Sequence, residues 1–304
     1  MKQKTGFAHL NRGEVSDTLA EKAVIMYKRK GFTPLEKISN GASRRFLTGF
    51  TLIELLVVIS IIALLVSILT PALSKAKAQA RAAICLSNMH QWGIACKMYT
   101  GDNRGRMPPE EEEYNWITPL LPYFENVDLL LCPSAKKPVI VPPTGWQWGR
   151  KFKAWVAEEN DVLFVGSYGI NMFVGQNDDG GRGGKLWGTV IVKGAAYIPV
   201  LTDSAVEEDS PLHDDQPPAY DGQTYEAEGG SSVNEIKDRC INRHNKHING
   251  VFADFHASKI GLKELWELRW HKDWNPNNAP PPDFCTVTGN YDGWMCHMKD
   301  YWVP

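Results

Sequence analysis

The strongest pattern along the chain is an apolar run over residues 50–70, in which Glu54 is the single charged residue. As an α-helix rising about 1.5 Å per residue, this run is about 30 Å long, which matches the hydrocarbon thickness of a bilayer. The run is apolar on all sides, which argues against a core helix with one buried face. It is also longer than the apolar region of a secretory signal peptide. We therefore predict a transmembrane helix over residues 50–71.

Past Pro71 the pattern becomes amphipathic. Helical periodicity resumes at once, so the proline is expected to kink the helix rather than end it. A glycine-containing turn at residues 101–105 supplies the stop signal. We predict one long helix over residues 50–102, with a second half that packs under a soluble domain. The expected stripe on this half, at a 3.6-residue period, consists of Leu73, Ala76, Ala80, Ile84 and Ala95.

Beyond the helix, short β-like runs alternate with segments rich in Gly, Pro and acidic residues. Residues 175–188 and 204–235 have the composition of surface loops, and residues 261–271 that of a short late helix. The predicted fold is α+β: a long N-terminal helix, then a globular domain over residues 103–304 with a small, mainly antiparallel sheet and long loops. The predicted strands are 139–141, 161–165, 189–192, 197–201 and 250–255.

Charge is distributed unevenly along the chain. The formal net charge is −2, but residues 1–49 hold ten Lys/Arg and four Asp/Glu, a net charge of +6, and the rest of the chain carries −8. A basic leader before an apolar helix fits the positive-inside pattern. We therefore expect a single-pass protein of the cytoplasmic membrane, with its N-terminus in the cytoplasm and its globular domain outside. The acidic remainder argues against nucleic acid as a partner, because that requires a basic patch.

The start of the apolar run reads GFTLIE over residues 49–54 and resembles the processing site of type IV prepilins and type II secretion pseudopilins. The resemblance implies a pilin-like fold, cleavage by a prepilin peptidase between Gly49 and Phe50, and methylation of Phe50. It implies an assembly role for Glu54, and a kinking proline is common in this family at the place of Pro71. The implied partners are the peptidase, other pilin or pseudopilin subunits, an inner-membrane assembly platform and membrane lipid.

The position of Glu54 also has a physical explanation. A carboxylate near the bilayer centre costs roughly 2.5–3.5 kcal/mol, and less near an interface, so it needs a cation at the same depth. Cleavage after Gly49 would create an α-amino group on Phe50. We expect this amine to pair with Glu54 of its own chain or of a neighbouring subunit.

The leader differs from the family pattern in two respects. Residues 1–49 are long for a prepilin leader, and translation starts either at Met1 or at Met26. The sequence GFTPLE at residues 31–36 is similar to the processing site. No apolar run follows it, so it cannot insert into a membrane and we do not expect it to be cut.

The globular region resembles a large pseudopilin-like family that is abundant in planctomycetes and lentisphaerae. That family has a His followed about nine residues later by Asp-Gly, whereas here His244 precedes Asp254 by ten residues and Phe255 replaces the Gly. Asp-Gly suits a tight turn with φ > 0, in which Phe would be strained. We therefore expect a different turn or a shifted register, and transfer no role to Asp254. The matching segments are 85–109, 130–134, 167–171 and 243–260.

Three histidines, His244, His247 and His256, form with Asp254 the densest set of possible metal ligands. Their neighbours are Asn, Lys and Gly, which are typical of a hairpin rim. We expect solvated or hydrogen-bonded histidines, and no metal.

Other chemistry is poorly supported. The acidic loops 178–180 and 207–209 offer oxygen ligands of the kind that calcium prefers, but they lack the EF-hand spacing, so we expect no cofactor. Two S-x-x-K matches, 74–77 and 134–137, lack the partner motifs of the enzymes that use them. We therefore do not expect an enzyme.

The six cysteines form no C-x-x-C motif. Outside the cytoplasm an even number suggests disulfides, and buried free thiols are the alternative. Cys85 and Cys96 would lie about 16 Å apart along one helix, which is too far to bridge. Cys285 and Cys296 are the easiest local pair to propose, and the sequence does not choose among the other pairings.

Besides an anchored metallohydrolase that would use His244, His247 and His256, which these observations disfavour, two functions remain. The first is a structural subunit that polymerises through residues 50–102 into a type II secretion or type IV pilus-like filament. The second is a membrane-anchored binding module whose loop aromatics contact a polysaccharide or a secreted protein. Its candidate residues are Trp146, Trp148, Trp187, Trp274 and Trp294.

Overall fold

The computed structural model describes residues 51–108, 116–124, 126–139, 147–159, 162–175, 184–224, 234–274, 286–287, 291–292, 294–296 and 298. The leader, Gly49 and Phe50 lie outside these residues, so the predicted cleavage site stays a prediction. The chain divides into two compact units after Ala78, and each is treated by itself below.

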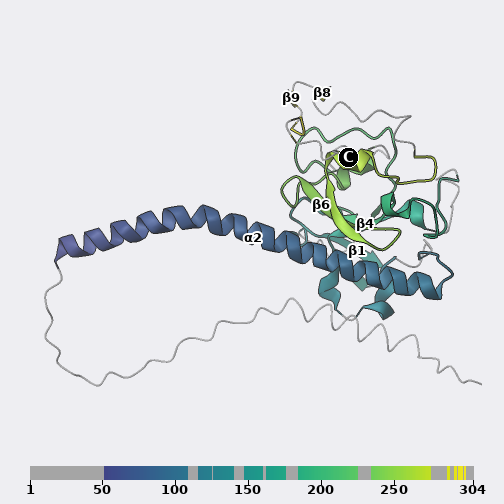
Figure 1. Cartoon of the computed structure of the whole chain (residues 1–304), viewed down its shortest axis with the longest axis horizontal. Helices are drawn as coiled ribbons and strands as arrows, with labels where there is room; N and C mark the ends of the chain where they lie inside the picture. Colours follow the sequence, from purple (N-terminus) through teal and green to yellow (C-terminus); the bar gives the residue numbers. More distant parts are fainter. Residues whose placement is uncertain are drawn as a thin grey trace, which may run out of the picture. The chain divides into compact units, whose positions relative to one another are not determined.

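One helix, α2 (Leu52–Asp102), runs without a break through Pro71 (Figure 1). The prediction that this proline does not end the helix is confirmed. The helix stops where expected, because Arg104 and Gly105 both adopt positive φ angles, 57° and 77°. The Gly105 N–H returns to the Thr100 carbonyl at 2.7 Å, which satisfies one of the last carbonyls of the helix.

The buried face of the second half of α2 differs from the predicted stripe. Ala95 is buried as expected, but Ile84 is 53% exposed and Leu73 is 55% exposed. The side chains that pack into the domain follow a spacing of three and four residues and are mostly not aliphatic, which is why a search for aliphatic positions missed them. They are Ala82, Cys85, Met89, Trp92, Cys96 and Tyr99.

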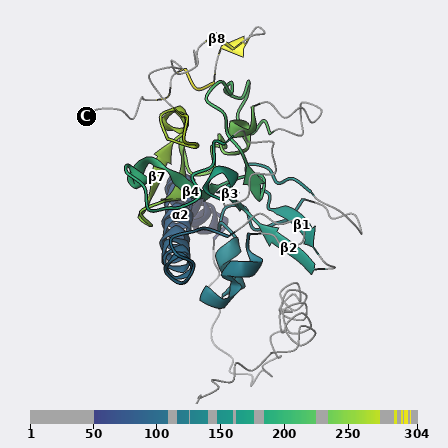
Figure 2. The same cartoon turned by 90° about the vertical axis from the view of Figure 1, so that its right-hand side faces the viewer.

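The helix packs against a five-stranded sheet with the order β5-β3-β4-β6-β7, which is antiparallel except for the β3–β5 pair. Figure 2 shows this sheet beside a separate hairpin, β1 and β2. The predicted α+β class with a small, mainly antiparallel sheet is confirmed. The strands are β1 (Trp155–Glu159), β2 (Val162–Gly166), β3 (Tyr168–Asn171), β4 (Pro199–Asp203), β5 (Glu208–Asp209), β6 (His247–Phe252), β7 (Ala257–Gly261), β8 (Thr286–Val287) and β9 (Tyr291–Asp292).

Three of the predicted strands, 161–165, 197–201 and 250–255, overlap with β2, β4 and β6, whereas 189–192 is not a strand. The Val190 N–H donates to the Gly105 carbonyl at 2.9 Å, so the backbone here binds the loop after α2 instead of a neighbouring strand. Residues 140–141, in the first predicted strand, lie outside the described residues.

The predicted late helix over residues 261–271 is reduced to one 3₁₀ turn, η7 (Lys263–Trp266). The N–H groups of Arg269 and Lys272 donate to the carbonyls of Tyr197 and Lys185, at 2.9 and 3.0 Å. These tertiary hydrogen bonds take donors that a longer helix would have used.

The turn between β6 and β7 retains a positive φ although it has no glycine. Phe255 adopts φ = 70°, and its N–H donates to the Phe252 carbonyl at 2.8 Å. Asp254 is not among the positive-φ residues, so this is not the turn that Asp-Gly forms with two left-handed positions. A single left-handed residue closes the hairpin, and here that residue is a phenylalanine.

Candidate functional site

The first half of α2 exposes its apolar side chains. Its most apolar 18-residue window has a mean hydropathy of 3.0, and none of that window is buried. The large side chains from Leu52 to Leu69 are 46–78% exposed. Leaving this much apolar surface in water is unfavourable by about 25 cal/mol per Å². By length and composition the helix can cross a membrane, and it fits a membrane-anchored protein.

The polar side chains of this half are satisfied within the helix. Glu54 Oε2 accepts hydrogen bonds from the Thr51 N–H at 2.9 Å and the Thr51 hydroxyl at 2.8 Å, while the Glu54 N–H approaches Thr51 Oγ1 at 3.3 Å. This is the reciprocal capping box of a helix N-terminus. Further along, the hydroxyls of Ser60, Ser67 and Thr70 donate to backbone carbonyls one turn earlier. Glu54 therefore helps to cap the N-terminus of the helix, in addition to being the single charged residue of the apolar run.

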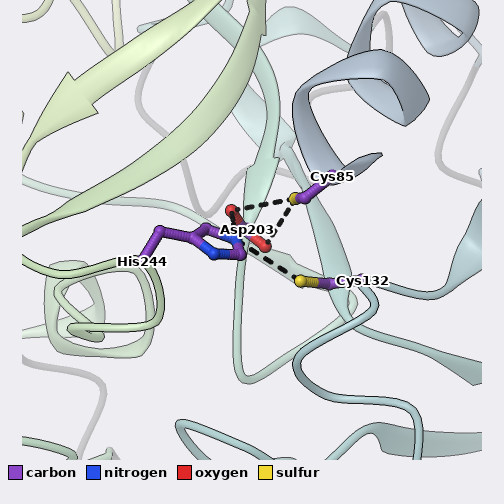
Figure 3. A group of neighbouring side chains, drawn as sticks. All are labelled: Cys85, Cys132, Asp203 and His244. Carbon is purple, nitrogen blue, oxygen red and sulfur yellow. Dashed lines mark hydrogen bonds and ion pairs between the residues drawn. The ribbon is translucent and has the colours of Figure 1, made fainter. Parts of the chain in front are cut away.

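The globular domain contains a buried group of four side chains that sequence reasoning did not bring together: Cys85, Cys132, Asp203 and His244 (Figure 3). Their ligand atoms all lie within 4.8 Å of one another. Cys85 Sγ is 3.5 Å from both oxygens of Asp203, and His244 Nε2 is 3.4 Å from Cys132 Sγ and 3.3 Å from Asp203 Oδ2. Both cysteines and the aspartate are fully buried, and His244 is 5% exposed.

Each member of this tetrad comes from a different part of the chain. Cys85 lies on the buried face of α2, and Asp203 is the last residue of β4. Cys132 follows the 3₁₀ turn η2 (Val127–Leu130) and is fixed by its N–H, which donates to Ser167 Oγ. His244 precedes β6, where its N–H donates to the His247 carbonyl. The tetrad therefore forms only when helix and sheet have packed together.

Asp203 is held by further partners. The Arg243 guanidinium donates to Asp203 Oδ1 at 3.0 Å and to the Ser167 and Ser204 carbonyls, and the Asn249 N–H donates to Asp203 Oδ2 at 2.9 Å. A buried charge is tolerated only when it is paired and hydrogen-bonded, as this carboxylate is.

The same contacts shift the pKa values of the tetrad. Burial opposes ionisation of Asp203, but the charges of His244 and Arg243 outweigh it and hold the pKa of this carboxyl well below its usual range. Burial also opposes protonation of His244, but Asp203 raises the pKa of this imidazole to about 9. Burial works against the Cys132 thiolate, and hydrogen bonds from Cys85 and His244 nevertheless lower its pKa to about 6. Burial and the hydrogen bond to Cys132 raise the pKa of Cys85.

The arrangement is not that of a Cys-His-Asp catalytic triad. In such a triad one ring nitrogen faces the nucleophile and the other faces the carboxylate. Here the single nitrogen Nε2 of His244 faces both Cys132 and Asp203, while Nδ1 is buried without a hydrogen-bond partner among the described residues. The four donor atoms point at one another, which is the arrangement of ligands around a shared ion.

Of the three histidines considered from the sequence, His244 and His247 lie side by side with ring centroids 5.8 Å apart, and His256 lies away from both. His247 begins β6 and pairs with Gly261, whereas His256 lies in the turn at the other end of the same hairpin. At about 3.3 Å per residue along β6, the two are about 16 Å apart. His256 is exposed and binds Asp254 through Nδ1 at 2.5 Å. Only His244 of the three enters the tetrad.

The remaining candidates are distributed as follows. Cys296 is disulfide-bonded, and its expected partner Cys285 lies outside the described residues, so that pairing stays a prediction. In the acidic loop 207–209, Asp209 is buried against Arg239. Loop 178–180 lies outside the described residues.

Most of the described loop tryptophans are fixed by burial or by a hydrogen bond and are not available to a ligand. Trp187 and Trp274 are 7% and 3% exposed, and the Trp294 indole donates to the Pro218 carbonyl at 2.8 Å. Trp148 is 37% exposed, and Trp146 lies outside the described residues. Their burial favours a role in fixing loops over contact with a ligand.

The tetrad left a weak signal in the sequence. Its cysteines are far apart and lack the close spacing of zinc motifs, so no local pattern joins them. Cys85, Cys132 and His244 do fall inside the segments that carry the resemblance in the globular region, 85–109, 130–134 and 243–260. Asp203 falls outside all of them.

Comparison with known proteins gives one finding. A family model described as the prokaryotic N-terminal methylation motif matches residues 48–70. No curated protein and no solved structure is significantly similar to the chain. The matched segment covers the predicted cleavage site, Glu54 and the apolar run. The match supports the similarity of this segment to type IV pilins and pseudopilins, and the apolar N-terminal helix fits a membrane-anchored protein.

Proposed function

We propose that the protein is a structural pilin or pseudopilin subunit. It is cut between Gly49 and Phe50 by a prepilin peptidase, methylated on Phe50, and assembled through α2 into a type II secretion or type IV pilus-like filament. The observation that carries the proposal is that the methylation motif at residues 48–70 opens a helix whose apolar half is entirely exposed. Such a helix needs either lipid or neighbouring helices around it.

The capping box gives the Glu54 carboxylate fixed hydrogen-bond donors before cleavage. Its carboxylate is bound by Thr51, which lowers the cost of placing it at the membrane interface. Cleavage puts a new amine on Phe50, directly before Thr51. Glu54 can then exchange a neutral hydroxyl for a cation, on its own chain or on the neighbouring subunit. A charge-assisted hydrogen bond is roughly twice as strong as a neutral one, which favours that exchange.

The second half of α2 has two contact faces. At about 100° per residue, Trp92 and Cys96 point into the domain, Ile94 and Met98 lie on the opposite side, and Ile84 lies on the flank between the two faces. Ile84, Ile94 and Met98 are 53%, 59% and 52% exposed. An aliphatic face opposite the packed face suits close packing against helices of neighbouring subunits.

The charge of the leader sets the proposed orientation. A net charge of +6 over residues 1–49 favours retention of the leader in the cytoplasm. The globular domain then lies outside the cytoplasmic membrane, and a subunit that enters a filament takes its apolar helix with it.

N-terminal sequencing and intact-mass analysis of the protein from its native host test the proposal. The expected mature chain begins at methylated Phe50. Gly49→Val should block this processing, whereas Gly31→Val, in the similar sequence at 31–36, should not. A mature chain that starts at Met1, or beyond residue 72, would rule the proposal out.

A further inference from the structure

We propose that Cys85, Cys132, Asp203 and His244 form a structural zinc site in the globular domain. The proposal stands on the geometry and chemistry of these four side chains, and it does not depend on the assignment as a pilin-type subunit. It differs from the histidine-only cluster, because two of its ligands are thiolates and one is a carboxylate from β4.

Three of the six distances between the donor atoms match those of a tetrahedral zinc shell, and all six lie within 4.8 Å. With Zn–S of about 2.3 Å and Zn–N or Zn–O of about 2.0–2.1 Å, the edges of the tetrahedron are about 3.3 Å for N···O and about 3.5–3.6 Å for S···O and S···N. The structure has 3.3 Å from His244 Nε2 to Asp203 Oδ2, 3.5 Å from Cys85 Sγ to Asp203, and 3.4 Å from Cys132 Sγ to His244 Nε2. These three distances are compatible with a zinc ion at the centre of the four side chains.

The donor set selects zinc among common metals. Calcium and magnesium prefer shells made of oxygen, which two thiolates and an imidazole do not provide. Copper(I) prefers soft ligands such as thiolates, whereas a carboxylate is a hard ligand that suits other metals. Zinc accepts sulfur, nitrogen and oxygen together in four-coordinate sites. Two thiolates, one carboxylate, the Arg243 guanidinium and a divalent cation sum to zero charge, so the buried site would be neutral.

The closure of the site indicates a structural role and not a catalytic one. Four protein ligands fill a tetrahedral shell, whereas catalytic zinc keeps a position open for water or substrate. Cys85, Cys132 and Asp203 are fully buried, so a substrate has no access to them. The ligands join α2, the segment after η2, the end of β4 and the loop before β6, and a metal at their centre would hold these four parts together.

Neighbouring groups orient the ligands, as the outer shells of metal sites do. Asp203 is fixed by Arg243 and by the Asn249 N–H. The Tyr168 hydroxyl lies 3.4 Å from Cys85 Sγ. These contacts limit the rotamers of the carboxylate and the thiol before any ion binds.

Oxidation of the two thiols to a disulfide is the main competing outcome. The two Sγ atoms lie within 4.8 Å of each other, and both cysteines are free in the structure. A disulfide would consume both thiolates and destroy the zinc site. The mass of the chain and its metal content distinguish the two outcomes.

The experiment uses the full chain purified in detergent without chelator, with zinc measured by mass spectrometry of the element. We expect one zinc per chain and two thiols that are protected from alkylation until a chelator is added. Replacement by Co²⁺ should give the thiolate charge-transfer and visible bands of a tetrahedral site. Cys132→Ser should lose the metal and these bands. Cys96→Ser, which removes another buried free thiol from α2, should keep both.

Because Cys132→Ser can fail to fold, the unaltered chain supplies a second readout. A chelator should lower its melting temperature, and added Zn²⁺ should restore it, while Mg²⁺ should not. The proposal is overturned if the folded chain neither contains zinc nor takes up Zn²⁺ or Co²⁺. A chain that is lighter by two hydrogens, with Cys85 linked to Cys132, overturns it as well.

Discussion

The backbone carbonyl oxygen of Phe255 lies 2.5 Å from the position that a Cβ atom on Gly93 would occupy. Helix α2 and the β6–β7 turn therefore touch at the level of the backbone, with no room for a side chain between them. Phe255 holds its carbonyl there from a left-handed conformation, φ = 70°. The contact fixes the helix against the sheet next to Trp92, one of the largest fully buried side chains.

Gly93→Ala should destabilise the domain. A methyl group would have to displace the Phe255 backbone, and overpacking of this kind costs about 1–3 kcal/mol, which exceeds the gain of about 1 kcal/mol in helix propensity. Gly101→Ala is the matched control, because no atom lies within 4 Å of its Cβ position. Urea unfolding should show a lower midpoint for Gly93→Ala and an equal or higher one for Gly101→Ala. Equal stabilisation by both would contradict the close contact.

Arg239 should be essential for stability. Its buried guanidinium binds Asp209, the Gly169 and Ile170 carbonyls and the Thr202 hydroxyl, so it ties β3, β4 and β5 together. Arg239→Met removes the cationic partner of buried Asp209 and the hydrogen bonds to β3 and β4, and should cost about 3–5 kcal/mol in the free energy of unfolding.

The control for Arg239 is a pair at the surface. Lys151 and Asp221 are 23% and 31% exposed, and Lys151→Met should cost no more than about 1 kcal/mol. The double variant Arg239→Met/Asp209→Leu should recover part of the loss, because it removes the buried carboxyl group. If denaturant unfolding gave Arg239→Met and Lys151→Met the same free energy of unfolding, the prediction that Arg239 is essential for stability would be wrong.

His271 should make stability fall in mild acid. It is fully buried against Phe173 and Trp274, and neither ring nitrogen has a hydrogen-bond partner among the described residues. Burial, with the charge of Lys185, lowers its pKa to about 4. The unfolded chain therefore takes up this proton first as the pH falls below about 6.5, so stability is full above that pH and decreases toward pH 4.

Between pH 7 and pH 5 this one histidine should account for a loss of about 2 kcal/mol. His271→Phe should be less sensitive to pH over this interval, whereas His90→Gln, at an exposed position on α2, should behave like the unaltered protein. Unfolding curves at the two pH values measure the difference. An unchanged pH dependence in His271→Phe would show that other groups cause it.

The outer face of α2 should matter for assembly but not for folding. Ile94→Glu places a charge at a position that is 59% exposed, so the melting temperature should stay the same while incorporation into filaments is lost. Ile191→Glu, 76% exposed and outside α2, should affect neither. Crosslinking and filament pelleting from the native host are the measurements. Normal incorporation of Ile94→Glu would exclude this face as the contact between subunits.

The long helix could be predicted because its signals are local. An apolar run that fills all sides of a helix needs no knowledge of the rest of the chain. The capping pair of Thr51 and Glu54 is equally local, but it was not predicted from the sequence. The buried face of its second half was predicted wrongly. It uses Cys85, Met89, Trp92 and other side chains that do not stand out as an aliphatic stripe.

The sheet could be predicted only in part. Strand β3 (Tyr168–Asn171) contains Gly169 and Asn171, which have low strand propensity, and it was missed. Tertiary contacts fix it: the Asn171 side chain donates to the carbonyls of Pro199 and Trp270, both at 2.9 Å. The prediction of a late helix over residues 261–271 was wrong for the same reason, because backbone N–H groups there donate to distant segments.

The tetrad could not be predicted from local sequence patterns. Its ligands come from four segments that meet only in the folded domain, whereas the three histidines close in sequence divide between the two ends of a hairpin, His244 and His247 at one end and His256 at the other. The register of β6 and β7 places His256 at the far end of the hairpin from His247, which agrees with the expectation that these three histidines do not form a metal site.

The order of the tetrad along the chain has a consequence for how each subunit matures. Cys85 is the first of the four after the predicted membrane segment, residues 50–71, and His244 is the last to be synthesised. In the proposed orientation, the growing chain must pass the membrane in an unfolded form, so the four ligands first meet outside the cytoplasm. The supply of zinc at that surface, and not in the cytosol, would then determine how many exported chains become rigid enough to build a filament.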